Sequence, residues 1–467
     1  MAGIPRLVIS APHGRSGKTT LSLGLAAAFC RRGLRVQPFK KGPDYIDPSW
    51  LTEAAGRPCR NLDLFLMEAG ALLSGFVRAS ESADLALIEG AHGLFDGLDV
   101  EGTNSTAHLA RLLRAPVVLV IDASRMTQSV AALVRGFVDF EPGVNVAGVI
   151  LNQVSGSRHH AKLAEALCRH AKIPLLGALP RGSSLTIPDR HLGLVPTDEQ
   201  TSLVPVVERL RRAVEASVDL DGLLELARRA PPLPVAPQRR DRMPDPDVRL
   251  GVARDRAFTF YYPENLEALR RAGAELVPVD TLQDASLPDV DGLYLGGGFP
   301  EMFLDALEAN AGLRRDIRLA IAGGLPVYAE CGGLMYLARR ITWSGRSAPM
   351  VGALPCDIEM TGRIQGHGYV RGSVAAANPF FPVGTALRGH EFHYSRATNL
   401  GAVEFAYRLE RGRGIVEGKD GLVAGNVLAA YTHLHALGAP GWADGLVALA
   451  RAHRAGRPAS WEMSGAR

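Results

Sequence analysis

The stretch VYAECGGL at residues 327–334 decides how the second half of this chain is expected to fold. An apolar run from Leu325 to Ala329 has the length of a buried strand, and glycines follow directly after Cys331. A strand that turns sharply into a helix through glycines raises one side chain above the edge of its sheet. The stretch therefore predicts a nucleophile elbow with Cys331 as nucleophile and with its thiolate favoured by the helix N-terminus. The alternative is a small buried core cysteine.

A thiol nucleophile needs a base, and His433 is the candidate that we rank first. It ends an apolar run over residues 427–432 that has the composition of a core strand. Ligands of open α/β sheets bind at the carboxyl ends of the strands, so this run predicts His433 at the same edge as Cys331. His390 and His393 are the competing candidates, and a core or surface histidine is the alternative for each of them.

A glycine run at residues 296–298 follows another strand pattern, at residues 292–295. Without side chains, the backbone amides of such a run can approach a ligand closely. We therefore predict an oxyanion hole from the amides of Gly297, Gly298 and Gly332. A flexible loop is the alternative interpretation of the glycines alone.

The first half of the chain contains a phosphate-binding loop pattern. Strand-like residues 7–10 precede the loop APHGRSG and the tripeptide KTT, and apolar side chains then recur at helical spacing. Strand, glycine loop, Gly-Lys-Thr and helix in this order are typical of a P-loop, whose backbone amides point at phosphates. The full pattern requires glycine at Pro12, so we expect Gly14 to supply the turn. The predicted nucleotide-binding residues of the loop are Gly14, Ser16, Gly17, Lys18, Thr19 and Thr20.

Polar residues end three further strand patterns of the first half. Glu89 ends an apolar run where a carboxylate on the Mg²⁺ side of a P-loop belongs, and the Thr19 hydroxyl can also reach Mg²⁺. Asn152 ends another run, and its amide can pair with an adenine edge, although a turn asparagine is the alternative. The segment KKGPDYIDP at residues 40–48 places lysines, carboxylates and a tyrosine at the same edge, beyond what a Gly-Pro-Asp turn explains.

The length of 467 residues exceeds what one core supports, and strand patterns alternate with helical patterns in both halves. This predicts an α/β fold with a doubly wound, largely parallel P-loop domain at residues 1–229 and a second α/β domain at residues 248–467. Proline-dense residues 230–247 predict a semi-rigid linker between the two domains.

The composition is ordinary for a globular protein, with 47% hydrophobic and 21% charged residues and a net charge of +4. Nothing in this charge demands a nucleic-acid partner. The five cysteines have no paired spacing, so neither a disulfide framework nor a zinc site is indicated. We find no signal peptide and no apolar run that could span a bilayer, and expect a soluble, cytoplasmic protein without a membrane partner. A homodimer is compatible with the sequence.

The chain resembles the CobB/CbiA family of corrin a,c-diamide synthases, which amidate cobyrinic or hydrogenobyrinic acid in cobalamin biosynthesis. The first half resembles a dethiobiotin-synthetase-type P-loop domain, and the second half resembles a class I glutamine amidotransferase domain. The motifs that carry the resemblance follow one another along the chain: KGPDYIDP (41–48), EG (89–90) with Asp96, GGGFPE (296–301), ECGG (330–333) and GHEFHYS (389–395). Amidotransferases in general end in His-x-Glu, where the glutamate orients the histidine, whereas this chain has HLH at residues 433–435.

The resemblance implies an ATP- and glutamine-dependent ligase that forms C–N bonds, with ATP and Mg²⁺ as cofactors and with L-glutamine and a corrin polycarboxylate as partners. Cys331 and His433 would release ammonia from glutamine, and the first domain would activate corrin carboxylates. The resemblance further implies Thr19, Asp47 and Glu89 as residues on the Mg²⁺ side, and substrate contacts from Asp44, Tyr45 and Asp96.

Three alternatives remain open on the sequence. The first is a cobyric acid synthase, which amidates other corrin side chains and for which we expect a longer C-terminal domain. The second is a Cys-dependent hydrolase fused to an ATPase, without a corrin partner. The third, from a different class, is a partition-type P-loop switch ATPase, which would need a lysine where this chain has His13 and would not carry the Cys331 domain.

Overall fold

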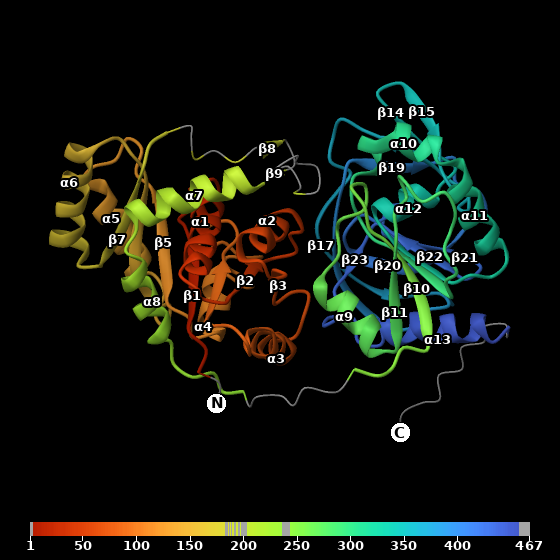
Figure 1. Ribbon diagram of the computed structural model, residues 1–467, viewed down its shortest axis with the longest axis horizontal. Coiled ribbons are helices and arrows are strands. Elements are labelled where there is room, and N and C mark those ends of the chain that lie inside the picture. The colour runs from red at the N-terminus through yellow and green to blue at the C-terminus, as the bar shows by residue number, and fades with distance from the viewer. Residues whose placement is uncertain are drawn as a thin grey trace. The chain divides into compact units, whose positions relative to one another are not determined.

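The computed structural model describes residues 3–182, 203–235 and 243–456, together with 185, 187, 189–190, 193–194 and 197. Two compact units form, one from Met1–Leu64 with Glu68–Arg240 and one from Phe65–Met67 with Asp241–Arg467 (Figure 1). Of the linker that we expected at residues 230–247, residues 236–242 lie outside the described part of the chain.

The first unit is built on seven parallel strands in the order β3-β2-β4-β1-β5-β6-β7. These strands are β1 (Arg6–Ser10), β2 (Val36–Lys41), β3 (Arg60–Leu62), β4 (Leu85–Glu89), β5 (Val117–Asp122), β6 (Val146–Val154) and β7 (Leu175–Pro180). The helices are α1 (Lys18–Arg31), α2 (Ile46–Ala55), α3 (Ala69–Ser80), α4 (Thr106–Leu112), α5 (Ser129–Asp139), α6 (Ser157–Ala166), α7 (Val204–Ser217) and α8 (Leu220–Arg228). A π-helical turn (Leu167–Ala171) continues α6, and β8 (Asp189–Arg190) pairs with β9 (Gly193–Leu194).

Helices cover both faces of this sheet. On one face, α1 packs tightly on α7, since a Cβ on Gly24 would lie only 2.5 Å from Cγ2 of Val214. On the other face, α3 contacts the sheet through Phe76, whose ring centroid lies 4.8 Å from that of Phe39. The central strands β1, β4 and β5 are buried almost throughout, as continuous apolar runs predict. The α/β class with a parallel P-loop-type sheet is therefore confirmed.

The second unit is built on ten strands in the order β11-β10-β12-β13-β22-β21-β20-β17-β18-β23. These strands are β10 (Val248–Ala253), β11 (Ala274–Val279), β12 (Gly292–Leu295), β13 (Val327–Glu330), β17 (Gly366–Val374), β18 (Ala386–His393), β20 (Glu404–Arg411), β21 (Lys419–Ala424), β22 (Val427–Ala430) and β23 (His433–Leu434). A smaller sheet joins β14 (Arg340–Trp343), β15 (Arg346–Pro349), β16 (Asp357–Met360) and β19 (Ser395–Thr398). The helices are α9 (Pro263–Arg271), α10 (Leu304–Ala309), α11 (Ala311–Ala322), α12 (Gly332–Leu337) and α13 (Trp442–Arg454), with a 3₁₀ turn at Pro300–Phe303.

The ten-stranded sheet has two parts. Strands β11, β10, β12, β13 and β22 are parallel, and strands β21, β20, β17, β18 and β23 add an antiparallel extension. The extension was not predicted, because strands such as β20 contain few buried and several exposed, charged residues and so carry a weak apolar signal. Its last strand, β23, ends the order of the sheet, although it begins only three residues after the end of β22, which lies in the middle of that order.

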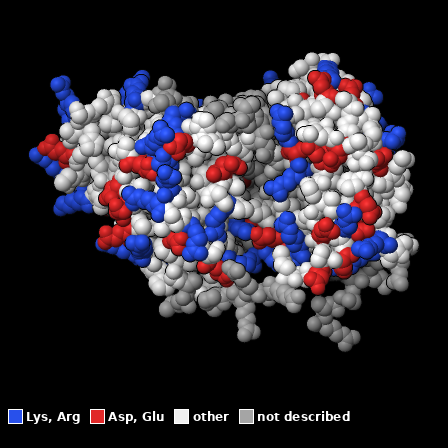
Figure 2. All heavy atoms as spheres, in the orientation of Figure 1, with Lys and Arg blue, Asp and Glu red and all other residues white. Residues whose placement is uncertain are grey.

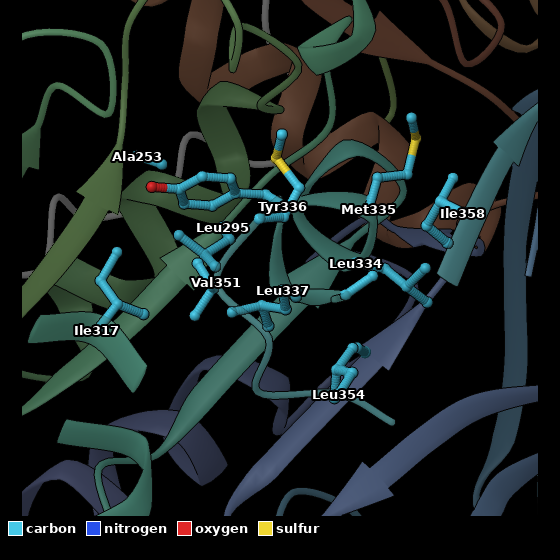
Figure 3. Close-up of a cluster of buried hydrophobic side chains, with 14 of the residues drawn as sticks. Ala253, Leu295, Ile317, Leu334, Met335, Tyr336, Leu337, Val351, Leu354 and Ile358 are labelled. Carbon is cyan, nitrogen blue, oxygen red and sulfur yellow. The ribbon is translucent and has the colours of Figure 1, made fainter. Parts of the chain in front are cut away.

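Helix α12 anchors the region after Cys331 in an apolar core. All six of its residues are buried, and the core around it includes Leu295 of β12 and Ile358 of β16 (Figure 3). Gly333 brings the helix against the sheet, since a Cβ at this position would lie 2.2 Å from the carbonyl oxygen of Leu295. The glycine that the sequence places after Cys331 is thus required by close packing on backbone.

We expect Gly333→Ala to destabilise the protein, because the neighbouring backbone cannot move aside easily. Overpacking of this kind costs about 1–3 kcal/mol, which a lowered thermal midpoint in a melting experiment would report. Gly362→Ala is the matched control, since a Cβ there meets no atom within 4 Å. Equal midpoints for the two variants would contradict this packing role.

The surface carries mixed charges. On the face drawn in Figure 2, Lys and Arg side chains lie among Asp and Glu side chains, and the described residues show no broad area of a single sign there. Separately, none of the helices in the described part of the chain has both the length and the apolar character to cross a membrane.

Candidate functional site

Cys331 lies at a sharp turn between β13 and α12, as the elbow pattern predicted. Its backbone has φ 47° and ψ −100°, a strained conformation for a residue with a side chain. The amide of Cys331 donates to the carbonyl oxygen of Ala430 at 2.7 Å, which fixes the turn to the end of the neighbouring strand β22. The side chain is buried, with 5% of the residue exposed.

For the Cys331 thiol, burial outweighs the amide of Gly332 at the helix N-terminus, which lowers the pKa as expected, so the thiolate is not the favoured form in the free protein. Burial raises the pKa of this thiol far above its ordinary value, and the carboxylate of Glu301 raises it further. Helix α12 has only six residues, and its N-terminal field does not offset the desolvation of a buried anion. The thiol is therefore protonated at neutral pH and needs a base.

His433 is buried near the same strand ends, but not at the end of a long strand as predicted. Strand β22 stops at Ala430, and His433 begins the separate strand β23. The cause is Asp420, whose carboxylate accepts from the amides of Tyr431 (3.0 Å) and Thr432 (2.9 Å). Since these amides bond to a side chain, the chain leaves the sheet before His433 and pairs with β18 instead.

The glycines predicted to form an oxyanion hole border these two residues. A Cβ on Gly297 would lie 2.5 Å from Cε1 of His433, and a Cβ on Gly332 would lie 3.0 Å from the amide nitrogen of Gly298. The structure therefore brings Gly297, Gly298 and Gly332 together beside Cys331 and His433. Their role toward an oxyanion stays a prediction.

The competing histidines are both buried and in different surroundings. The ring of His390 stacks on that of His433 with centroids 4.9 Å apart, and burial followed by the nearby His433 holds the pKa of His390 well below its usual range. His393 stacks on Tyr431 at 3.7 Å, with Nε2 lying 3.7 Å from Oε2 of Glu391. Of the two, His390 lies beside His433, and the choice of His433 as the base stays a prediction.

The P-loop of the first unit has its predicted position between β1 and α1. Gly14 lies in the turn, but the left-handed residues are Arg15 (φ 61°) and Gly17 (φ 96°). Gly14 therefore does not supply the positive φ of this turn. The ammonium of Lys18 donates to the carbonyl oxygens of His13 (3.1 Å) and His92 (2.6 Å). Burial, followed by the nearby charge of Lys40, lowers the pKa of Lys18 to about 8.

The remaining loop residues frame the start of α1. Ser16 is buried and donates its hydroxyl to the carbonyl oxygen of His13 at 3.0 Å, while Thr20 lies in the first turn of the helix. Asn152 donates its amide to the carbonyl oxygen of Ser16 at 3.0 Å and accepts from the amide of Gln153 at 2.9 Å. Asn152 thus holds the loop in the free protein, and its contact with adenine stays a prediction.

The residues predicted on the Mg²⁺ side converge at the ends of β2 and β4. The Thr19 hydroxyl donates to Oε1 of Glu89 at 2.7 Å, and the Lys40 ammonium donates to the same oxygen at 2.7 Å and to the carboxylate of Asp47. The strand register explains the meeting, because Lys40 lies opposite Glu89. No cluster of three or more His, Cys, Asp or Glu side chains suited to a metal occurs among the described residues. Lys40 is thus the cation that these carboxylates share, a role that the sequence did not reveal.

One atom of this group supports a cation site all the same. Oε2 of Glu89 is buried and has no hydrogen-bond partner within the described part of the chain. Burial raises the pKa of Glu89, and the nearby Lys40 opposes that rise. An unsatisfied carboxylate oxygen beside a threonine hydroxyl is a donor set that fits Mg²⁺. The residues that would hold the metal are Thr19, Asp47 and Glu89.

The three residues predicted to face substrate have separate local roles. Oδ1 of Asp44 accepts from the amides of Ile46 (2.8 Å) and Asp47 (3.2 Å) at the start of α2, and burial, with the nearby charge of Asp47, raises the pKa of Asp44 to about 7. Tyr45 is half-buried just before α2. Asp96 is exposed and accepts from the amide of Gly93 at 2.9 Å. Their contact with a substrate stays a prediction.

Two family models match the chain. The CobQ/CobB/MinD/ParA nucleotide binding domain matches residues 7–195, and the CobB/CobQ-like glutamine amidotransferase domain matches residues 249–440. A curated relative from Magnetococcus marinus, named cobyrinate a,c-diamide synthase, is 48% identical over 94% of this chain and 96% of its own length. The chain belongs to the cobyrinate a,c-diamide synthase family. Relatives of the same name from Methanosarcina acetivorans and Archaeoglobus fulgidus are each 43% identical, over 97% and 93% of this chain and 97% and 95% of their own lengths.

In this diamide synthase family member, we expect the raised pKa of Cys331 to appear in its alkylation. The rate with iodoacetamide should rise about tenfold per pH unit between pH 8 and 10, because the reactive thiolate is a minor species throughout. Mass spectrometry of the labelled peptides measures each cysteine separately. Cys356 is a matched buried control whose pKa burial raises to about 11, and exposed Cys168 should react faster at pH 7. A Cys331 rate that levels off below pH 8 would show a thiolate in the free protein instead.

Proposed function

We propose that this protein catalyses the ATP- and glutamine-dependent amidation of the a and c acetate carboxylates of cobyrinic or hydrogenobyrinic acid. The observation that carries the proposal is full-length identity of 48% to a cobyrinate a,c-diamide synthase, together with a P-loop in one unit and a Cys331 elbow in the other. We place the reaction in the cytoplasm, with small-molecule partners, glutamine and a corrin polycarboxylate, and with neither nucleic acid nor membrane.

Ammonia is released in the second unit. The Sγ atom of Cys331 attacks the side-chain carbonyl carbon of glutamine, and His433 takes the thiol proton. The amides of Gly298 and Gly332 stabilise the charge that develops on the carbonyl oxygen. His433 then protonates the leaving nitrogen, and the C–N bond breaks to give ammonia and a γ-glutamyl thioester. Water hydrolyses the thioester to glutamate and restores the thiol.

Activation takes place in the first unit. A corrin carboxylate oxygen attacks the γ-phosphorus of ATP, ADP leaves, and an acyl phosphate forms. Ammonia attacks the acyl carbon, the C–O bond to phosphate breaks, and an amide and inorganic phosphate result. Lys18 and the loop amides bind the phosphates, and Asp44, Tyr45 and Asp96 contact the corrin side chains. Thr19, Asp47 and Glu89 would hold Mg²⁺, which would supply charge neutralisation for the phosphates of ATP.

The two-site proposal predicts a split phenotype for Cys331→Ala. This variant should lose glutamine-dependent amidation and keep amidation with ammonia, because only the ammonia-releasing step uses the thiol. The measurement is the mass gain of cobyrinic acid and of hydrogenobyrinic acid in the presence of ATP, with either nitrogen source.

Wild type should add two amide groups to the preferred ring with both nitrogen sources. The matched control is Cys356→Ala, which removes a buried thiol of the same unit that is not part of the turn between β13 and α12. Absence of amidation of both rings by wild type would overturn the corrin assignment.

The cation site predicts a changed requirement for Mg²⁺. Asp47→Asn and Glu89→Gln should raise the Mg²⁺ concentration that gives half-maximal ATP turnover by at least about tenfold, since each removes a ligand charge. Asp84→Asn serves as control, because Asp84 pairs with Arg35 on the surface of the same unit. An unchanged Mg²⁺ requirement in the first two variants would contradict the assignment.

A further inference from the structure

We propose that Glu330 is the positioning residue for His433, in place of the glutamate that the sequence HLH lacks. Oε2 of Glu330 lies 3.5 Å from Nδ1 of His433. Glu330 immediately precedes Cys331, so one strand end supplies both the nucleophile and the partner of its base. This inference rests on the proposed glutamine chemistry of the second unit.

The carboxylate of Glu330 is fully buried and held by several donors. Oε1 accepts from the amide of Leu434 (3.0 Å) and the hydroxyl of Tyr328 (3.2 Å), and Oε2 accepts from the hydroxyl of Tyr294 (3.1 Å). Burial, and next the charge of Glu330, raises the pKa of both tyrosines well above the usual range, so both remain donors. A buried carboxylate is costly unless it is satisfied in this way. These donors hold the carboxylate of Glu330 in place beside the imidazole of His433.

The position relative to His433 fits an orienting role. With Nδ1 directed at Glu330, the imidazole keeps Nε2 for the thiol, the arrangement by which a carboxylate sets the tautomer of a catalytic histidine. A separation of 3.5 Å is long for a hydrogen bond, as catalytic contacts in ligand-free proteins often are. The proton balance is simple: Nε2 takes the thiol proton and returns it to the leaving nitrogen, while the Nδ1 proton stays between His433 and Glu330.

Other groups near His433 do not offer the same partner. His390, on β18, stacks on His433 and stays neutral because its pKa lies well below the usual range. His435 has a buried carboxylate of its own, with its Nε2 lying 3.5 Å from Oε2 of Glu264. The pair of His435 and Glu264 thus matches the pair of His433 and Glu330 in separation and burial, but it does not adjoin Cys331 in sequence.

The test compares Glu330→Gln with Glu264→Gln in the full-length protein. Glutamine hydrolysis is followed by steady-state kinetics from pH 5 to 9, and a diazoketone analogue of glutamine reports the acylation of Cys331 by mass spectrometry. Glu330→Gln should lower kcat by about 100-fold or more and leave KM within about twofold. The acidic limb of its kcat/KM profile should move to lower pH, because the imidazolium loses an anionic partner. Glu264→Gln should leave this limb in place.

A third variant covers the case in which Glu330→Gln does not fold. Glu330→Asp keeps the negative charge but moves it one methylene away from His433. Its kcat should therefore lie between those of wild type and Glu330→Gln, and the acidic limb of its kcat/KM profile should stay near that of wild type. A wild-type kcat in Glu330→Asp, or equal kcat losses without a limb shift in Glu330→Gln and Glu264→Gln, would overturn the inference. Absence of both hydrolysis and labelling in wild type would instead reject the proposed glutamine chemistry itself.

Discussion

The hydrogen bond from the amide of Cys331 to the carbonyl oxygen of Ala430 is the contact on which the site of the second unit depends. It closes the parallel pairing of β13 with β22 and joins a strained turn to the strand that leads to His433. The strain at Cys331 persists because the surrounding packing fixes it from both sides. Gly333 lies against the backbone of Leu295 below the turn, and the core around α12 leaves the helix no other position.

In the first unit, the comparable constraint is charge. The carboxylates of Asp47, in the first turn of α2, and Glu89, at the end of β4, repel each other, and the ammonium of Lys40 lies between them. Thr19 connects this group to the P-loop, so the loop and the strand ends form one hydrogen-bonded network. The unsatisfied oxygen of Glu89 marks where that network remains incomplete within the described residues.

Much of this arrangement could be predicted from the sequence because parallel strands collect their terminal residues at one edge. Cys331 and Glu89 were found in this way, since Cys331 follows a short apolar run and Glu89 ends one, whereas Thr19 was found from the Gly-Lys-Thr pattern of the P-loop. The role of Glu330 was not predicted, because the sequence does not indicate which side chain a glutamate at the end of such a run will contact. The end of β22 was predicted wrongly for a related reason. Asp420, ten residues before Ala430, accepts hydrogen bonds from the two amides that would otherwise continue the strand pairing.

The antiparallel extension therefore takes part in placing the base, although its strands β17, β20 and β21 carried no recognisable motif. Strand β21 contributes Asp420, and β18 pairs with β23, which begins at His433.

The adjacency of Glu330 and Cys331 in the chain has a mechanical consequence. Two side chains on consecutive residues move together when their strand shifts. Thermal displacement of β13 therefore moves the thiol of Cys331 and the carboxylate of Glu330 by the same amount. A partner on a distant loop would have to follow such a shift independently. The alignment of this site is accordingly insensitive to small movements of the sheet, and sensitive to any change in chain length between the two residues and the turn that follows them.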